Sequence, residues 1–467
     1  MSLWSQWYSV VAPLRAACSR TRSFLWLLAA LAGLCARSDL LGVTSIVRTL
    51  GLAQRCYDRL LDLFHSPALD VAHLTRLWTQ RALSLFPVHR FAGRPVLLGD
   101  GIKIPKSGRK MPAVKLLHQE SEGNTKPEYI MGHSIQVLSM LVAAGASFFA
   151  VPLAGRIHEG VKFTNRDQKT LPEKFAALLD SLGIAGPFYL VADAYYACKQ
   201  VILHLQRSGS HLVSRVRRST AAYQPMPIDH APRGRGRPRL YGQKIKLWDL
   251  FDSPTQVWQS ADSPVYGERG VTLRFVCLDL LWRPVQRLVR FVLVDHPTRG
   301  RMILIGTDLL MPAIDIIRLY GLRFKIELSF KQALRVIGVY AYHFWMRSMP
   351  KIARASRTQH LHHKSDHYRD AVRRKLGAYH RHIQIGLIAQ GTVQYLAVSY
   401  PRLVWASFGS WLRTIRPGIP PSEFVTASAL RNSLPEFLAE RDTALLFKKF
   451  LQERIDVGNY KALRLTG

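Results

Sequence analysis

Residues 95–104 read PVLLGDGIKI, an apolar run in which Asp100 is the single carboxylate. A short run of Val, Leu and Ile residues bounded by Pro and Gly indicates a buried strand. The pattern returns in FYLVAD, residues 188–193, where Asp193 ends the run. Further strands are predicted at 113–118, 132–143 and 211–216, and helices at 171–182 and 194–206. This order predicts an α/β domain with a mixed sheet, a fold that places ligands at the carboxyl ends of its strands.

The charge of the chain favours a polyanionic partner. Its 467 residues include 65 Lys and Arg against 31 Asp and Glu, which gives a formal net charge of +34. Because hydrophobic residues make up 48%, a disordered basic tail is excluded and domains with substantial cores are expected. Cationic side chains that neutralise phosphates release condensed counterions, so we expect the partner to be nucleic acid.

The blocks around the predicted sheet differ in their apolar spacing. Residues 3–86 have helical spacing, residues 217–308 are rich in strand patterns, and helical spacing returns at Ala313. The strand-rich block therefore reads as an insertion before the last helix of the α/β unit. The expected divisions are a helical, DNA-binding region at 1–90, the first part of the core at 91–216, a β-rich insertion with a basic arm at 217–308, the final core helix at 309–345, and a helical basic region at 346–467.

The cysteines and the apolar segments bear on location. Five cysteines occur without a CxxC pair, which suits a reducing compartment. The longest apolar run, residues 24–36, has 13 residues and is shorter than the roughly 20 needed to cross a bilayer. We interpret it as a buried helix, with a signal peptide as the alternative. The expected location is the cytoplasm, in association with the nucleoid, and no membrane partner is expected.

One stretch near the N-terminus has the pattern of a helix pair. Residues 43–50 and 53–64 have helical spacing and flank Gly51. The apolar stripe of the second helix contains Tyr57, Leu60, Leu61 and Phe64, and Arg55 and Arg59 point away from it. Two short helices around a Gly with arginines on the second can form a helix-turn-helix that enters a major groove. An ordinary helical hairpin is the alternative.

A third carboxylate accompanies Asp100 and Asp193. In the helix predicted after Pro312, Glu327 shares one stripe with the polar residues Tyr320, Arg323 and Lys331. A separate apolar stripe is formed by Leu319, Leu322, Ile326, Phe330, Ala333 and Ile337. The polar stripe therefore lies beside the buried face, where Glu327 can face the two strand carboxylates. Three carboxylates without a Cys or His motif suit a hard divalent ion such as Mg²⁺.

Each carboxylate also has an ordinary structural explanation. Asp100 can cap a turn, Asp193 can cap the helix that follows it, and Glu327 can pair with Lys331 at i, i+4. Taken singly, each of these explanations is the simpler one.

Taken together, the three segments resemble a known family. LLGDGIKI around Asp100, YLVADAYYA around Asp193 and LYGLRFKIELSFKQ around Glu327 resemble the DDE transposases of bacterial insertion sequences. The resemblance covers residues 96–344 and implies an RNase H-like catalytic domain interrupted by a β-insertion. It also implies DNA cleavage at the ends of the element and strand transfer into target DNA, by an enzyme that is a homodimer on DNA. The three carboxylates would be catalytic and would hold two Mg²⁺ or Mn²⁺ ions, and no nucleotide cofactor is implied.

The family often carries the signature Y-x2-R-x3-E-x6-K on its catalytic helix. Tyr320, Arg323 and Glu327 fit it, but Leu334 occupies the lysine position. Lys331 lies on the same stripe, so we assign it the role of the lysine. The resemblance then implies that Tyr320, Arg323 and Lys331 contact the DNA phosphate near the cut.

Further basic residues are candidates for DNA contacts. They are Arg215 near the end of the strand predicted at 211–216, Arg235 and Arg237 in the Gly-Arg-Gly-Arg-Pro arm, and Lys103 and Lys106 beyond Asp100. Arginines on an extended arm can enter a narrow minor groove. The alternative for the arm is a solvated linker.

Two other functions use the same residues. A domesticated DNA-binding protein would keep the scaffold without cleavage, and a nuclease on the same fold would degrade DNA rather than join it. Terminal inverted repeats beside the coding sequence would favour the transposase over both.

Overall fold

The structure is a computed structural model that describes residues 2–119, 127–226, 240–409, 414–415, 419–440 and 443–456. It divides into two compact units. The first comprises Met1–Val88, Gly101–Ile184 and Leu328–Gly467, and the second comprises His89–Asp100 and Ala185–Glu327.

The second unit contains the parallel strands that carry two of the predicted carboxylates. Strand β2 (Arg94–Pro105) enters this unit with its residues up to Asp100, and β7 (Tyr189–Ala192) lies parallel to it. Strand β8 (His211–Arg215) is parallel to β7, and β14 (Gly300–Gly306) is antiparallel to β8. All four residues of β7 are buried, as expected for a parallel strand covered on both faces. The predicted mixed α/β sheet is confirmed.

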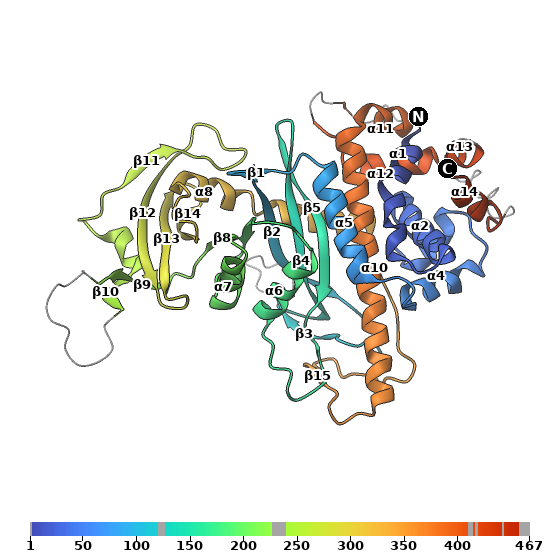
Figure 1. Ribbon diagram of the computed structural model, residues 1–467, viewed down its shortest axis with the longest axis horizontal. Helices are drawn as coiled ribbons and strands as arrows, with labels where there is room; N and C mark the ends of the chain where they lie inside the picture. The colour runs from blue at the N-terminus through green and yellow to red at the C-terminus, as the bar shows by residue number, and fades with distance from the viewer. Residues whose placement is uncertain are drawn as a thin grey trace. The chain divides into compact units, whose positions relative to one another are not determined.

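The strand-rich block extends this sheet with antiparallel strands (Figure 1). The order runs β10-β9-β12-β13-β14-β8-β7-β2, and β11 pairs with β12. The added strands are β9 (Ala221–Pro225), β10 (Tyr241–Lys246), β11 (Gln259–Asp262), β12 (Thr272–Trp282) and β13 (Arg287–His296). A short strand, β1 (Arg90–Phe91), pairs with β2, and the 3₁₀ helix η3 (Leu247–Asp252) follows β10. The strand-rich character predicted for this block is therefore confirmed, and its role as an insertion stays a prediction.

The helices of the second unit differ from the predicted ones. The segment after β7 begins as a 3₁₀ turn, η2 (Ala194–Tyr196), before α7 (Lys199–Arg207), and α7 packs on β8. Helix α8 (Ala313–Gly321) packs across β7, β8, β13 and β14. After a turn the chain continues as α9 (Lys325–Gln332) and the π-helical segment η4 (Ala333–Ile337).

The prediction of one continuous helix after Pro312 is therefore wrong. Gly, a poor helix former, ends α8 at position 321, and the next turn uses i to i+3 hydrogen bonds such as Lys325 N to Leu322 O. The apolar stripe survives this break, because Leu322 and Ile326 are 2% and 0% exposed.

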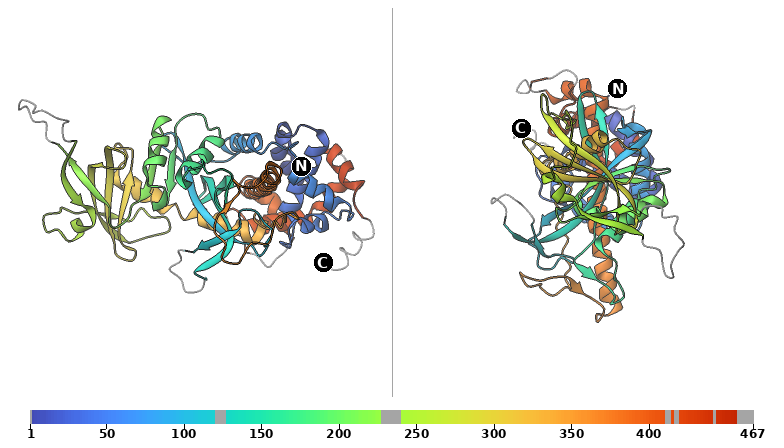
Figure 2. Two further views of the ribbon diagram at one scale, coloured as in Figure 1. Left: turned by 90° about the horizontal axis from the view of Figure 1, so that it is seen from below. Right: turned by 90° about the vertical axis from the view of Figure 1, so that its left-hand side faces the viewer.

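The first unit is mainly helical. Its N-terminal helices are α1 (Leu3–Val11), η1 (Ala12–Ala17), α2 (Thr21–Ala36), α3 (Val43–Thr49), α4 (Cys56–His65) and α5 (Val71–Leu85). Its later helices are α6 (Leu171–Ser181), α10 (Asp366–Ser399), α11 (Pro401–Phe408), α12 (Glu423–Asn432), α13 (Leu434–Ala439) and α14 (Leu445–Gln452). The prediction of helical N- and C-terminal parts is confirmed. The left view of Figure 2 shows α10 end-on beside the N-terminal helices, which are blue. Among these helices, α10 contacts α2 and α4.

Strands of the first unit lie against the long helix. They are β3 (Lys115–His118), β4 (Tyr129–Ala144), β5 (Ser147–Ile157), β6 (Val161–Lys162) and β15 (Gln359–His360). Strand β4 pairs antiparallel with β3 and β5, and β5 packs on α10.

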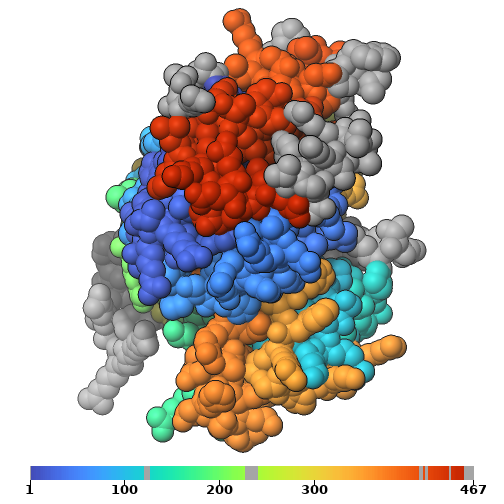
Figure 3. Space-filling model, turned by 90° about the vertical axis from the view of Figure 1, so that its right-hand side faces the viewer, coloured from blue at the N-terminus to red at the C-terminus, as the bar shows by residue number. Residues whose placement is uncertain are grey.

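The first and last helices of this unit share one core. Trp4 and Trp7 of α1 are fully buried, and they stack on Phe437 of α13 and Phe447 of α14. The N-terminal helices accordingly lie beside α13 and α14 on one face of the unit (Figure 3).

The apolar run at 24–36 lies in α2 and is buried throughout, as the buried-helix interpretation requires. Within the described ranges, no helix is both long and apolar enough to span a membrane.

The predicted helix pair around Gly51 forms as α3 and α4, with Arg55 and Arg59 exposed. Tyr57, placed in the apolar stripe by the sequence, is 37% exposed instead. The turn between the two helices is bridged by the C-terminal segment, through Leu52 and Ile455. Whether this pair enters a DNA groove stays a prediction.

Candidate functional site

Strand register makes Asp100 and Asp193 neighbours. Gly99 of β2 is paired with Ala192 of β7 in parallel register, and each carboxylate residue comes directly after its paired residue. Adjacent strands lie about 4.8 Å apart, so the two side chains emerge side by side from one edge of the sheet. Five consecutive buried residues precede each of them, which anchors the backbone at this point.

Arg323 joins the first of these carboxylates to the third. Its Nη1 donates to Oδ2 of Asp100 at 2.9 Å, and its Nη2 donates to Oε1 of Glu327 at 2.5 Å. The Arg323 and Asp100 side chains are each 19% exposed, whereas the Glu327 side chain is 54% exposed. Arg323 lies in the turn between α8 and α9, and Glu327 in the first turn of α9. One guanidinium therefore connects strand β2 to helix α9.

The pKa of Arg323 reflects this setting. Burial favours the neutral form, but the negative charge of Asp100, followed by Tyr320, Glu327 and Asp193, raises the pKa above its usual value. The guanidinium therefore stays charged and is held by several acidic groups at once.

Tyr320 belongs to the same neighbourhood. Burial raises the pKa of its phenol, and the negative charge of Asp193 raises it further. The positive charges of Arg323 and Arg215 lower it in part. The site in the second unit thus brings together the candidates Asp100, Asp193, Tyr320 and Arg323, with Arg215 near them.

The ordinary structural explanations for the carboxylates do not match these contacts. Asp193 precedes η2, but its side chain forms no capping hydrogen bond there. Asp100 lies within a strand and pairs with Arg323, and Glu327 pairs with Arg323 rather than with Lys331.

The three carboxylates do not form a metal site in this arrangement. Their oxygens are suitable ligands for a hard divalent ion. However, among the described residues no group of three or more His, Cys, Asp or Glu side chains could hold a metal ion. Arg323 instead occupies the position between Asp100 and Glu327 that a cation would take.

The other described residues predicted to contact DNA do not take part in the contacts of Arg323. Lys331 is exposed, one turn beyond Glu327 on α9, and Lys103 is exposed on β2 with its ammonium donating to His118 O. Arg235 and Arg237 lie outside the described residues.

Lys106 is placed in the interior, so the prediction that it contacts DNA does not fit. It is 6% exposed, and its Nζ donates to the carbonyl oxygens of Tyr340 and Tyr342. It also lies 3.8 Å from the centre of the Tyr342 ring. The chain folds inward here because Ile104 and Lys106 both point to the buried side, whereas Lys103 and Pro105 are exposed.

A hollow in the second unit involves residues that sequence reasoning missed. It encloses about 220 Å³ and is lined by Arg215, Tyr320 and Arg323 together with His296 and Arg299. The last two lie at the turn between β13 and β14, more than eighty positions after Arg215 in the sequence. No local motif marks them, because their partners come from distant segments.

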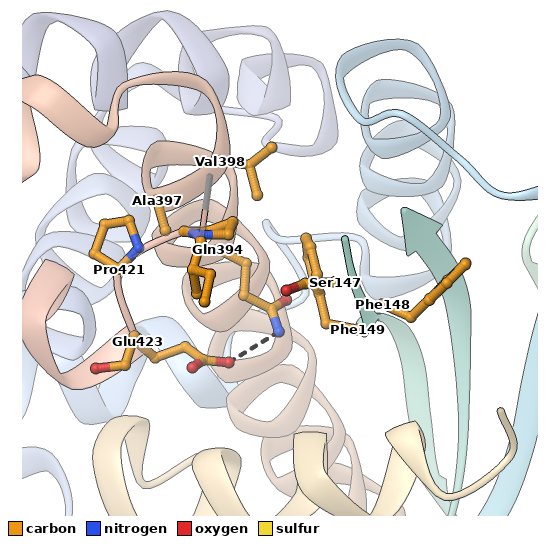
Figure 4. A pocket seen from close by; sticks show the side chains of 11 residues that line it. Ser147, Phe148, Phe149, Gln394, Ala397, Val398, Pro421 and Glu423 are labelled. Atoms are coloured by element: carbon orange, nitrogen blue, oxygen red, sulfur yellow. Dashed lines mark hydrogen bonds between the residues drawn. The ribbon is translucent and has the colours of Figure 1, made fainter. Parts of the chain in front are cut away.

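A second hollow, of about 170 Å³, lies in the first unit and contains none of the predicted site residues. Figure 4 shows the Glu423 carboxylate at its polar end, where it accepts a hydrogen bond of 3.1 Å from Gln394 Nε2. Phe148, Phe149 and Pro421 contribute to its apolar walls.

Asp100 and Asp193 directly follow paired residues of adjacent parallel strands, and Arg323 links Asp100 to Glu327 of α9. Carboxylates gathered in this way beside a guanidinium are suited to phosphoryl transfer. Residues 13–274 match the family described as DDE superfamily endonuclease. The chain belongs to this family. The matched residues include Asp100 and Asp193 and end before Glu327.

A solved structure titled as the cryo-EM structure of a piggyBac transposase synaptic complex with hairpin DNA is similar at a TM-score of 0.37 and 11% identity, over 97% of this chain and 84% of that one. Among curated proteins no match was found.

Proposed function

We propose that this chain is a transposase of the bacterial insertion-sequence type, which cuts DNA at the ends of its own element and joins the freed 3′-OH to target DNA. One observation carries the proposal: Arg323 bonds Asp100 and Glu327, and Asp193 and Tyr320 lie in its electrostatic neighbourhood, in a chain of the DDE superfamily endonuclease family. Asp100, Asp193 and Glu327 are the proposed catalytic residues.

The proposed roles of the other residues follow from their charge. Arg323 has a planar guanidinium suited to a bidentate contact with a phosphate, and Tyr320 and Lys331 would help to orient the scissile group. Lys103 and Arg215 are exposed cations suited to the DNA backbone. Catalysis by such a site depends mostly on positioning and electrostatics.

We also propose that the site binds divalent metal, as two Mg²⁺ or Mn²⁺ ions, which is what the resemblance to the DDE transposases implies. Its proposed ligands are the oxygens of Asp100, Asp193 and Glu327. For these oxygens to become ligands, Arg323 has to release Asp100 and Glu327. Because two DNA ends must be held at once, we also propose a homodimer on DNA.

Cleavage of end-sequence DNA tests the function. The full chain is incubated with Mg²⁺ and labelled duplexes taken from both flanks of its coding sequence. We expect strand cleavage followed by joining, and we expect Asp193→Asn to reduce cleavage about a hundredfold or more while DNA affinity is kept. Asp249→Asn, an exposed carboxylate on η3, is the matched control and should cut as the parent does.

Each other outcome favours another function. DNA binding without cleavage supports the DNA-binding protein, and degradation without joining supports the nuclease. An Asp193→Asn variant that cuts at the parent rate would contradict the proposed catalytic residues.

A further inference from the structure

The hollow beside the candidate site is both cationic and apolar. Three guanidinium groups, from Arg215, Arg299 and Arg323, line it together with Tyr320. Its apolar floor includes the buried residues Val294, Leu304 and Ile317. Arg323 is engaged by Asp100 and Glu327, whereas Arg215 and Arg299 have exposed side chains at this surface.

Arg299 is held at the hollow by a buried carboxylate. Its Nε donates to Glu268 Oε1 at 2.7 Å, across 31 positions of sequence. The Arg299 side chain is 50% exposed and that of Glu268 is 14% exposed. Since this bond uses only the Nε–H, it leaves the two Nη groups of Arg299 for a ligand.

Glu268 is itself fixed from two further directions. Its Oε2 accepts a hydrogen bond of 2.5 Å from Ser263 Oγ and one of 2.9 Å from His296 Nε2. Burial alone would raise the pKa of Glu268, but these bonds and the one from Arg299 lower it to about 2. The carboxylate is therefore charged throughout the neutral range.

The ring of His296 is oriented by the main chain. Its Nδ1 accepts from the N–H groups of Thr298 and Arg299, each at 3.2 Å, which assigns the hydrogen to Nε2, the atom that donates to Glu268. His296 is 2% exposed. A hydrogen-bond network thus runs from the backbone through His296 and Glu268 to Arg299. Its exposed end is the Arg299 guanidinium.

We propose that Glu268 is a positioning residue, which holds Arg299 at this hollow so that its guanidinium binds a phosphate of the DNA strand that reaches the candidate site. The inference rests on the proposed function and adds two residues to it. Another arginine–carboxylate pair of the same block serves as a comparison. The pair formed by Arg274 and Asp295 on neighbouring strands, at 2.5 Å, has no such histidine and does not line the hollow.

A double-mutant cycle on the full chain tests the proposal. Binding of a fluorescent duplex from the flank of the coding sequence is measured at several salt concentrations for the parent, Glu268→Gln, Arg299→Ala and the double variant. We expect Arg299→Ala to weaken binding several-fold and to reduce the slope of log affinity against log salt by about one. Glu268→Gln should weaken binding in the parent and have no further effect when Arg299 is absent.

Controls separate positioning from structure. Asp295→Asn and Arg274→Ala remove the comparison pair and should leave DNA affinity unchanged. Melting temperatures identify any variant that is unfolded, and Arg299→Ala, which alters a half-exposed side chain, keeps the test informative if Glu268→Gln does not fold. In a cleavage assay, Glu268→Gln should raise KM more than it lowers kcat.

Two results would overturn the proposal. One is an Arg299→Ala variant with the affinity and salt slope of the parent, and the other is a Glu268→Gln effect that is equal with and without Arg299. If the parent itself neither binds nor cuts DNA, the proposed function fails as well. If the parent cuts DNA and the Arg299→Ala variant binds DNA as the parent does, only the role of Glu268 and Arg299 is refuted.

Discussion

Arg323 donates to Asp100 at 2.9 Å and to Glu327 at 2.5 Å, so two of the three candidate carboxylates share a single guanidinium. Arginine also binds phosphate groups in the same bidentate manner. A DNA phosphate arriving at this site would therefore compete with the carboxylates for Arg323, and the carboxylate oxygens would be released when it binds. This exchange couples the state of the carboxylates to the presence of DNA.

Replacing Arg323 with Ala should increase the response of the protein to divalent cations. Without the guanidinium, Asp100 and Glu327 repel each other, so the free energy of unfolding in chelator should fall by about 1 to 3 kcal/mol. Millimolar MnCl₂ should restore more stability in Arg323→Ala than it adds to the parent. Thermal melts with and without MnCl₂ measure both effects.

The control for this experiment is Arg318→Ala. Arg318 pairs with Asp315 on the exposed side of α8, and this pair does not involve the candidate carboxylates. Its metal response should equal that of the parent. An Arg323→Ala variant whose melting temperature rises no more than that of the parent would show that Arg323 does not compete with a metal.

Stability should depend on pH through Lys106. Burial lowers the pKa of its ammonium from 10.5 to about 7. Between these two values the unfolded chain binds more protons, so the contribution of Lys106 to stability rises with pH from about 7 to about 10.5, by up to about 1.4 kcal/mol per pH unit. Lys106→Met should remove this rise, which denaturant melts across the pH range would detect.

Lys103→Met is the matched control, because Lys103 is exposed on the same strand. Its stability should follow the parent at every pH. If the stability of Lys106→Met changes with pH as that of the parent does, the pKa of Lys106 is not lowered by burial.

The positions of the two strand carboxylates could be predicted from the sequence, but the break in the helix that follows them could not. Lone acids after fully apolar runs predicted Asp100 and Asp193, because parallel core strands bring such positions to one edge of a sheet. The break after Gly321 could not be predicted in the same way. The apolar spacing through Leu322 and Ile326 continues regularly across it, and both side chains are buried on either side of the turn.

Two errors and one omission have different physical origins. Lys106 was assigned to the surface from its charge, although the alternation of a strand places it on the same side as Ile104, which is buried. The stripe position of Tyr57 assumed a helix covered along its whole length, whereas Tyr57 and the two residues after it in the first turn of α4 are exposed. Glu268 and Arg299 escaped notice because their contact is formed by tertiary structure alone.

The hollow in the first unit predicts a second pH effect, of opposite sign. Burial raises the pKa of Glu423, whose carboxylate accepts a hydrogen bond from the neutral amide of Gln394 (Figure 4). The folded state then binds more protons than the unfolded chain above about pH 4.3, so stability falls as pH rises from there through the raised pKa. Glu423→Gln should remove this loss and be at least as stable as the parent at pH 8.

The comparison variant is Glu436→Gln, at an exposed position on α13. Its stability should keep the pH dependence of the parent. If Glu423→Gln is less stable than the parent by the same amount at pH 4 and pH 8, the carboxylate is not kept neutral by its surroundings.

Two glycines of α10 should respond in opposite directions to Ala. A Cβ at Gly391 would lie 2.2 Å from Cζ2 of Trp78, and Trp78 cannot move away, because it is fully buried and its Nε1 donates to Pro152 O at 2.9 Å. Overpacking should outweigh the gain in helix propensity, so Gly391→Ala should lower the free energy of unfolding by about 1 to 3 kcal/mol. A Cβ at Gly377 meets only the mobile end of Arg381, at 3.1 Å, so Gly377→Ala should be stabilising by up to about 1 kcal/mol. Thermal and urea melts of both variants check this, and a Gly391→Ala protein as stable as Gly377→Ala would show that α10 does not pack against Trp78 this closely.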